Sequence, residues 1–308
     1  MLFKFSQLVK QPQVYDTQLL SKICPLQLRH KYLILEQKIR EAKELELEIY
    51  KMKDEDEGWK KLKISLEFTP QNTLNSKFII IRHALAWHNY FKRVTEFKDS
   101  NIYHYDLIDP PLQYLGTKQC DKLKLEINKL DFDKVYVSPF NYRAIQTTQL
   151  LFCNHPQKEK IQFILCPDIC EKISTINSIY KWGTLTDILK DNGNPIKFDF
   201  SQMPDNLEFW QFNLLQKCYN LSDCQPNKED QERFLVEEFV KKGSSFQLEY
   251  SRNVMNRVQG FVDKIKEDQT QSKIGIVTHF QIIKSILQCS RQRIDFKFGN
   301  GAVFGLNL

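Results

Sequence analysis

Three short runs of apolar, mostly β-branched residues stand out along the chain, and each one leads into polar side chains. They are residues 78–81 before Arg82 and His83, residues 135–137 before Ser138, and residues 274–277 before Thr278 and His279. Runs of this length and composition are typical of buried strands. Between them, apolar residues recur every three or four positions, which indicates helices. The alternation predicts an α/β fold: a mostly parallel sheet between two helical layers, a three-layer α/β/α sandwich.

Helical spacing marks three segments of this domain. We expect helices from Asp109, where two prolines open the segment, and over residues 144–152 and 250–266. Residues 172–235 differ, because they are rich in aromatic residues, Asn and Asp and are broken by Gly and Pro. We interpret them as an insertion over the C-terminal edge of the sheet that could act as a lid on a substrate.

An N-terminal extension, residues 1–76, precedes the domain of residues 77–308. Residues 28–53 have apolar positions at helical spacing, with Glu and Lys on the other faces, and an acidic run follows at 54–57. This pattern predicts a helix that packs against the main domain. A short coiled coil, and hence an oligomer formed through this helix, is the alternative.

Composition narrows the class of protein. The chain has 308 residues, a formal net charge of +6, 42% hydrophobic residues and 27% charged residues, which is ordinary for a globular protein. The positive charge is too dispersed to indicate nucleic-acid binding, but it favours small anionic substrates through electrostatic steering. No apolar run is long enough to span a membrane.

The eight cysteines are scattered, without the spacing of a disulfide framework or a zinc site. We therefore expect free thiols in a reducing compartment and a cytoplasmic location. Lysine and arginine outnumber acidic residues in the first 35 positions. A mitochondrial targeting segment is the alternative, although Pro12 and Pro25 would interrupt a long amphipathic helix there.

Candidate chemistry gathers where the predicted strands end. In an open parallel sheet, ligands bind outside the carboxyl ends of the strands. Arg82, His83, Arg143 and His279 follow three such strands. Imidazole and guanidinium groups at one edge predict a site for an anion, and phosphate is the first candidate.

Five segments carry this chemistry. They are residues 82–89 (Arg-His-Ala-Leu-Ala-Trp-His-Asn), 109–119 with Asp109, Pro111, Gly116 and Gln119, 138–147 with Ser138, Arg143, Gln146 and Thr147, 167–171 with Glu171, and 277–279. In this order they resemble the motifs of the histidine phosphatase (phosphoglycerate mutase-like) superfamily. The resemblance covers roughly residues 77–308 and implies a metal-independent phosphatase that needs no cofactor.

The resemblance also implies a role for each site residue. His83 would attack phosphorus and form a phosphohistidine, with its second nitrogen oriented by a backbone carbonyl. Arg82, Arg143 and His279 would bind the phosphoryl oxygens, and Asn89 would lie near the phosphate. One carboxyl group would protonate the leaving group and then activate water.

Glu171 holds the family position for that carboxyl group, and Asp168 is the second choice. His88 lies further along the helix expected after His83, so we expect it to point elsewhere, as a histidine of the pocket rim or of the structure. Three departures from the family pattern bear on the site: Ala84 replaces a glycine, Tyr142 is an extra residue before Arg143, and Phe280 replaces the glycine often found after the second histidine.

Two other functions remain open. A phosphoglycerate mutase is the first, although the Arg-Tyr-Gly stretch typical of mutases after the acid is absent beyond Glu171. A scaffold or binding protein that keeps the fold is the second, with residues 28–53 as its interaction element. For a phosphatase, sugar phosphates, nucleotides, inositol phosphates and phosphoproteins all fit, and a small molecule is favoured over a protein.

Overall fold

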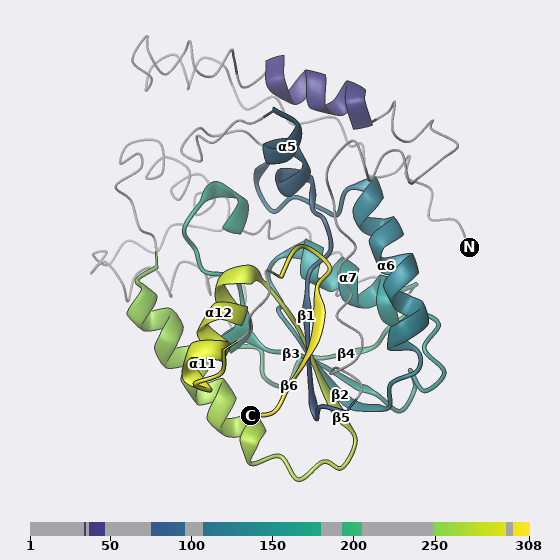
Figure 1. The fold of residues 1–308 in the computed structure, drawn as a ribbon, viewed down its shortest axis with the longest axis vertical. Helices are drawn as coiled ribbons and strands as arrows, with labels where there is room; N and C mark the ends of the chain where they lie inside the picture. Colours follow the sequence, from purple (N-terminus) through teal and green to yellow (C-terminus); the bar gives the residue numbers. More distant parts are fainter. Residues whose placement is uncertain are drawn as a thin grey trace.

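The computed structural model of the protein describes residues 34, 37–46, 75–95, 107–179, 193–204, 249–293 and 298–308. Six strands in these ranges form one sheet: β1 Phe78–Arg82, β2 Phe132–Val137, β3 Gln162–Leu165, β4 Phe198–Asp199, β5 Lys273–Thr278 and β6 Val303–Leu306. Their order is β4-β3-β2-β5-β1-β6, and all neighbouring pairs are parallel except β1 with β6. The expected mostly parallel α/β sheet is confirmed (Figure 1).

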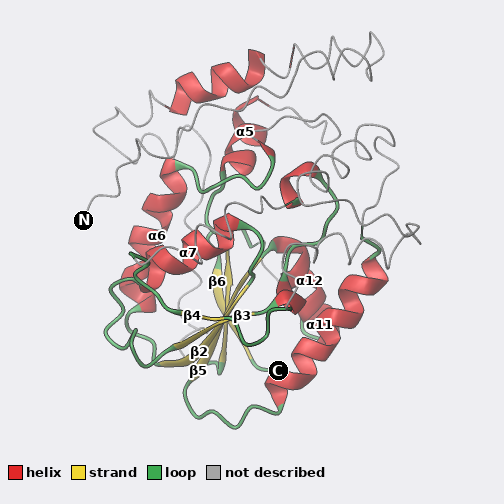
Figure 2. Cartoon of the chain, turned by 180° about the vertical axis from the view of Figure 1, so that it is seen from behind, coloured by secondary structure: helices red, strands yellow, loops and turns green. Residues whose placement is uncertain are grey.

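Helices cover both faces of this sheet. The helices are α5 Trp87–Thr95, α6 Tyr114–Ile127, α7 Tyr142–Phe152, α11 Ser251–Lys266 and α12 Phe280–Cys289, with short 3-10 turns η3 Pro167–Ile169 and η4 Ile176–Ser178. Helices α6 and α7 lie on one side of the strands, and α11 and α12 lie on the other (Figures 1 and 2). Within the described ranges, no helix has the length and apolar character needed to cross a bilayer.

The two faces of the sheet build two hydrophobic cores. Because successive side chains of a strand point to opposite faces, Ile79 and Ile81 pack beneath α6 and α7. Phe78 and Ile80 pack beneath α11 and α12. The three isoleucines of β1 are fully buried, and each contributes roughly 1.5–3 kcal/mol to the stability of the fold.

Strand register brings the site-bearing strands to one level. Arg82 of β1 lies opposite Thr278 of β5, and Val277 of β5 lies opposite Val137 of β2. Main-chain bonds continue this pairing beyond the strands. The His83 amide donates to the Thr278 carbonyl at 2.9 Å, and the Ser138 amide donates to the Val277 carbonyl at 2.9 Å.

The helix expected from Asp109 begins later, at Tyr114. Asp109 has a positive φ of 40°, and its Oδ1 accepts a hydrogen bond from the Tyr142 amide at 2.9 Å. Leu112 forms an isolated bridge with Ala86. The cap of α6 is Gln113, whose side chain accepts from the Leu115 amide. The predicted start is therefore wrong, because the segment before α6 is held extended against the loop that follows β1.

The predicted insertion is only partly described, over residues 172–179 and 193–204. The second range contributes a strand to the sheet, and the action of the insertion as a lid stays a prediction. Residues Phe198 and Asp199 form β4 beside β3, and Ile196 is buried in the core beneath α6 and α7. This stretch completes the sheet. The rest of the insertion lies outside the described residues.

Part of the N-terminal extension is helical and packs on α5. Residues 37–46 form the described part of the helix predicted over 28–53. Ile39 and Ala42 are buried, and the Tyr90 hydroxyl donates to the Ala42 carbonyl at 3.0 Å. Packing against the main domain is therefore confirmed for these residues. An oligomer formed through this helix stays a prediction.

Gly116 lets α6 approach the loop after His83. A Cβ at this position would lie 2.1 Å from the Leu85 carbonyl oxygen, and the Gln113 amide donates to the same oxygen at 3.0 Å. A side chain at Gly116 would therefore push α6 away from the loop.

We expect Gly116→Ala to lower the free energy of unfolding by about 1–3 kcal/mol, because the added methyl group overpacks a rigid backbone contact. Gly260→Ala is the matched control, since a Cβ at Gly260 in α11 would meet nothing within 4 Å. That variant should gain up to about 1 kcal/mol from helix propensity. Urea unfolding of both variants checks this, and equal effects would contradict the close approach.

Candidate functional site

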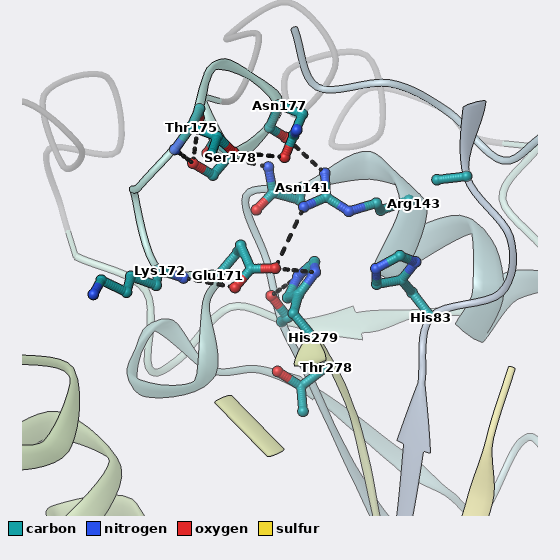
Figure 3. A network of polar contacts seen from close by, with 12 residues as sticks. His83, Asn141, Arg143, Glu171, Lys172, Thr175, Asn177, Ser178, Thr278 and His279 are labelled. Carbon is teal, nitrogen blue, oxygen red and sulfur yellow. Dashed lines mark hydrogen bonds and ion pairs between the residues drawn. The ribbon is translucent and has the colours of Figure 1, made fainter. Parts of the chain in front are cut away.

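His83 lies just beyond β1 at the carboxyl edge of the sheet (Figure 3), and its side chain is buried. Its Nδ1 lies 2.8 Å from the carbonyl oxygen of Ala84. A carbonyl only accepts, so Nδ1 carries the proton and Nε2 of the neutral ring keeps its lone pair. The predicted orientation by a backbone carbonyl is confirmed. Burial, followed by the charges of Arg143 and Arg82, lowers the pKa of His83 well below its ordinary value and keeps the ring neutral.

The loop after His83 is held by side chains from two helices. The Ala84 amide donates to Thr147 Oγ1 of α7 at 3.1 Å, and the Leu85 amide donates to Gln119 Oε1 of α6 at 2.9 Å. The Gln119 amide group then donates to the Asn300 carbonyl at 2.7 Å. Two polar residues of the sequence motifs, Gln119 and Thr147, thus hold the loop that follows His83.

Arg143 enters the site from the first turn of α7 and is fully buried. The extra residue before it, Tyr142, is the first residue of that helix, and Asp109 accepts its amide hydrogen. The insertion is therefore accommodated without moving Arg143 out of the site. One terminal nitrogen of Arg143 donates to the Asn177 carbonyl at 3.0 Å, and the other lies 3.8 Å from Glu171 Oε2.

Arg82 is held by two phenylalanines. Its guanidinium lies 5.1 Å from the ring centroid of Phe280, and its Nη1 donates to the Phe298 carbonyl at 3.2 Å. The rings of Phe280 and Phe298 lie 4.8 Å apart. Burial lowers the pKa of Arg82 to about 10, so the group stays charged at neutral pH. Phe280 therefore supports Arg82 through a cation–π contact.

His279 follows β5, and its ring centroid lies 5.1 Å from that of His83. Its Nε2 lies 2.8 Å from the Ser138 hydroxyl, and its Nδ1 lies 3.5 Å from Glu171 Oε2. This arrangement favours a proton on Nδ1, because Nε2 accepts from the hydroxyl while Nδ1 faces a carboxylate. Ser138, which belongs to a sequence motif but had no predicted role, orients the second histidine.

Glu171 follows η3, and Figure 3 shows its carboxyl group meeting Arg143 and His279. The Lys172 amide donates to its other oxygen at 2.9 Å. Burial raises the pKa of Glu171, opposed mainly by the charge of Arg143. A carboxyl group with a raised pKa holds a proton more readily, as a proton donor requires.

A buried ion pair holds the segment that carries Glu171. Arg257 of α11 lies 3.0 Å from Glu249 and donates to the Asp168 carbonyl at 2.6 Å. Glu249 accepts from the Ile173 amide at 3.1 Å and donates its own amide to the Ile173 carbonyl at 2.9 Å. The segment is thus fixed on both sides of Glu171. The charges of Arg257 and Lys264 act on the Asp168 carboxyl group, so this second-choice acid faces α11.

Two residues of α5 lie close to the site. His88 is buried, and its ring centroid lies 6.2 Å from that of His83, which is compatible with the expected histidine at the rim of the pocket. Asn89 accepts at its Oδ1 from the Ala86 amide at 3.4 Å and from the Asn300 side chain at 3.0 Å. Asn89 therefore ties down the loop, and its role as a phosphate ligand stays a prediction.

Unpaired polar atoms are concentrated in this site. Six buried side-chain nitrogen and oxygen atoms of the described residues have no hydrogen-bond partner, and four belong here: Arg82 Nε, His88 Nδ1, Arg143 Nε and His279 Nδ1. Elsewhere, buried polar groups are almost always satisfied. The N–H groups of Arg82, Arg143 and His279 are donors, and donors gathered around a neutral imidazole can bind a tetrahedral oxyanion. In the described part of the chain, no cluster of three or more His, Cys, Asp or Glu side chains could hold a metal ion.

No protein-family model and no curated protein matches the sequence. Several solved structures resemble the chain at low identity. An ecdysone phosphate phosphatase from Bombix mori is 15% identical, with a TM-score of 0.38 over 71% of this chain and 79% of that one. A phosphoserine phosphatase variant from Entamoeba histolytica is 18% identical, with a TM-score of 0.36 over 73% and 87%. An alpha-ribazole phosphatase from Shigella flexneri is 14% identical, with a TM-score of 0.38 over 75% and 95%.

Burial of the site histidines should make stability depend on pH. Burial is the main reason why the pKa values of His83, His88 and His279 lie well below 6.5. Between those values and 6.5 the unfolded chain binds more protons, so their contribution to stability is lost as the pH falls. We expect His83→Gln to lose less stability than the wild type between about pH 7 and about pH 5, by up to about 1.4 kcal/mol per pH unit.

Glu171→Gln provides a control of opposite sign. The raised pKa of Glu171 gives a contribution to stability that is lost as the pH rises through the folded-state pKa. Glu171→Gln removes this contribution, so the stability of the variant should increase more steeply with pH than that of the wild type. Urea unfolding at several pH values measures both slopes, and unchanged slopes would contradict the buried state of these groups.

Proposed function

We propose that this chain is a histidine phosphatase of the phosphoglycerate mutase-like superfamily, which hydrolyses a small phosphomonoester through a phosphohistidine on His83 and without a metal ion. The motifs at Arg82-His83, Arg143, Glu171 and His279 come together at one edge of the sheet (Figure 3). Their arrangement matches the chemical needs of phosphoryl transfer, in which catalysis is mainly positioning and electrostatic stabilisation.

The observation that carries the proposal is the set of unpaired donors around a neutral nucleophile. Arg82 and Arg143 each have a buried nitrogen without a partner among the described residues, and the buried Nδ1 of His279 has only the contact of 3.5 Å with Glu171, which is too long to count as a hydrogen bond. Leaving a buried donor unpaired costs about 1–3 kcal/mol. A protein that only kept the fold as a scaffold would gain stability by losing these groups. An anionic ligand that accepts from all three accounts for their presence.

Transfer begins at Nε2 of His83. Nδ1 donates to the Ala84 carbonyl, so the Nε2 lone pair attacks phosphorus while the bond from phosphorus to the leaving oxygen breaks. Arg82, Arg143 and His279 donate to the non-bridging oxygens and stabilise the charge on them. The ring becomes a phosphohistidine, and its positive charge is balanced by the phosphoryl group.

Glu171 serves both half-reactions. Protonated, it gives its proton to the leaving oxygen and releases the alcohol. Ionised, it then takes a proton from the water that attacks the phosphohistidine, which returns inorganic phosphate and free His83. The raised pKa of Glu171 supports the first step, and its charge contact with Arg143 at 3.8 Å supports the second.

His83→Ala should reduce turnover of phosphomonoesters by at least about four orders of magnitude, because no other group can carry the phosphoryl group between the half-reactions. Acid-labile, base-stable labelled phosphate should be trapped on the wild type after rapid quenching and should be absent from the variant. Peptide mapping should place the label at His83.

His155→Asn is the matched control. His155 is a buried histidine that packs against Phe132 and Phe152, away from the site. This variant should form the phosphoenzyme at the wild-type level. Turnover that survives loss of His83 would overturn the mechanism.

Glu171→Gln should have an effect that depends on the leaving group. An alkyl phosphate leaves as a basic alkoxide and should lose about 10²–10⁴-fold in the rate of phosphoenzyme formation, whereas p-nitrophenyl phosphate should lose much less. Single-turnover measurement of alcohol release separates this step from hydrolysis of the phosphohistidine.

Asp168→Asn is the control for that experiment, because the Asp168 carboxyl group faces Arg257 and Lys264 of α11. It should leave the rates for both substrates close to those of the wild type. Equal losses on both substrates in Glu171→Gln would assign Glu171 a structural role in place of proton transfer.

A further inference from the structure

His88 is a third histidine at the site, and the reaction described above does not use it. It lies in the first turn of α5, its side chain is buried, and its ring centroid is 6.2 Å from that of His83, with the two planes inclined by 43°. This distance is close to the 5.1 Å between the rings of His83 and His279. The ring of His88 is therefore a close neighbour of the ring of His83.

The hydrogen bonding of His88 separates it from a structural histidine. Its Nδ1 is enclosed and has no partner, and its Nε2 makes no hydrogen bond with the described part of the chain. His155, buried to a similar extent, has both nitrogens engaged: Nε2 lies 3.1 Å from the Leu130 carbonyl, and Nδ1 accepts from the Gln157 amide at 3.2 Å. A histidine kept for packing alone would resemble His155.

The charge around His88 indicates which kind of group it meets. Burial lowers its pKa well below the ordinary value, and the nearby charges of Arg143, Lys92 and Arg82 lower it further. No acceptor of the described residues lies near Nδ1 of His88 to bind a proton there. The single proton of the neutral imidazole is therefore on Nε2, where it can form a hydrogen bond with a ligand. His88 thus offers one N–H donor without adding charge to a site that already holds two guanidiniums.

We propose that His88 is a further substrate-binding residue, whose Nε2–H donates to a non-bridging oxygen of the phosphoryl group held in front of His83. The proposal rests on the function proposed above and extends its oxyanion site by one donor from α5. The ligand class is a tetrahedral oxyanion, and inorganic phosphate and tungstate are its simplest probes.

Two substitutions of His88 test the donor. Gln places an amide N–H near the position of the histidine Nε2–H, whereas Phe keeps the ring volume and removes the donor. A hydrogen bond to a charged oxygen corresponds to about 10- to 100-fold in affinity. We expect His88→Phe to weaken tungstate binding by about that factor in titration calorimetry. His88→Gln should stay within about threefold of the wild type.

His155→Phe is the matched control, because it makes the same change at a buried histidine outside the site. It should lose stability, since the Leu130 carbonyl and the Gln157 amide lose their partner, and keep its affinity for tungstate. Wild-type affinity in a folded His88→Phe would overturn the proposal and leave the proposed function intact. A wild type that binds neither tungstate nor phosphate would overturn both.

A measurement on the unmodified site covers the case in which His88→Phe does not fold. The ring ¹⁵N resonances of His88 can be assigned by their absence from the spectrum of His88→Gln. Addition of tungstate should shift the Nε2 resonance, because a hydrogen bond forms there. An unchanged His88 Nε2 resonance at saturating tungstate would overturn the proposal.

Discussion

The parallel register of β1, β5 and β2 is the constraint on which the rest of the site depends. Main-chain hydrogen bonds continue past the strand ends, from His83 to Thr278 and from Ser138 to Val277, so three consecutive strands of the sheet stop at one level. The backbone positions of the first residues beyond these strands are therefore fixed relative to one another. The ring of His83 lies beside that of His279, and the Ser138 hydroxyl forms a hydrogen bond with Nε2 of His279. A shift of one residue in any of these strands would turn the leading side chains to the opposite face of the sheet.

Burial then determines the charge state of each group in the site. The low polarity that keeps His83 neutral also raises the pKa of Glu171, so one physical cause gives both groups the protonation states that their proposed roles require. The unpaired nitrogens in the site lower its stability, and the two apolar cores on either side of the sheet offset that cost. Phe280 contributes both to packing and to the charge of the site. Its ring packs against Phe298, and it makes a cation–π contact with Arg82.

Much of this could be predicted from local patterns. Apolar runs that end in His or Arg predicted the strands and placed His83, Arg143 and His279 at one edge, because strand periodicity and parallel topology are local and regular. Contacts between distant segments could not be predicted. His88 comes within 6.2 Å of the His83 ring because residues 84–86 form a loop, bridged at Ala86 to Leu112, before α5 begins. The bonds of Asp109 and the pair between Glu249 and Arg257 join segments far apart in the sequence, and no local spacing signals them.

The helix of residues 37–46 has a consequence for where the folding unit begins. The Trp87 indole donates to Glu46 at 3.1 Å, and the Tyr90 hydroxyl donates to the Ala42 carbonyl. Both donors belong to α5, which starts only four residues after His83. A chain shortened to begin at the first strand would lose these two hydrogen bonds and uncover the apolar surface against which Ile39 and Ala42 pack. The sequence motifs place the start of the domain near residue 77, but the packing of α5, which follows the His83 loop, extends to residues 39–46.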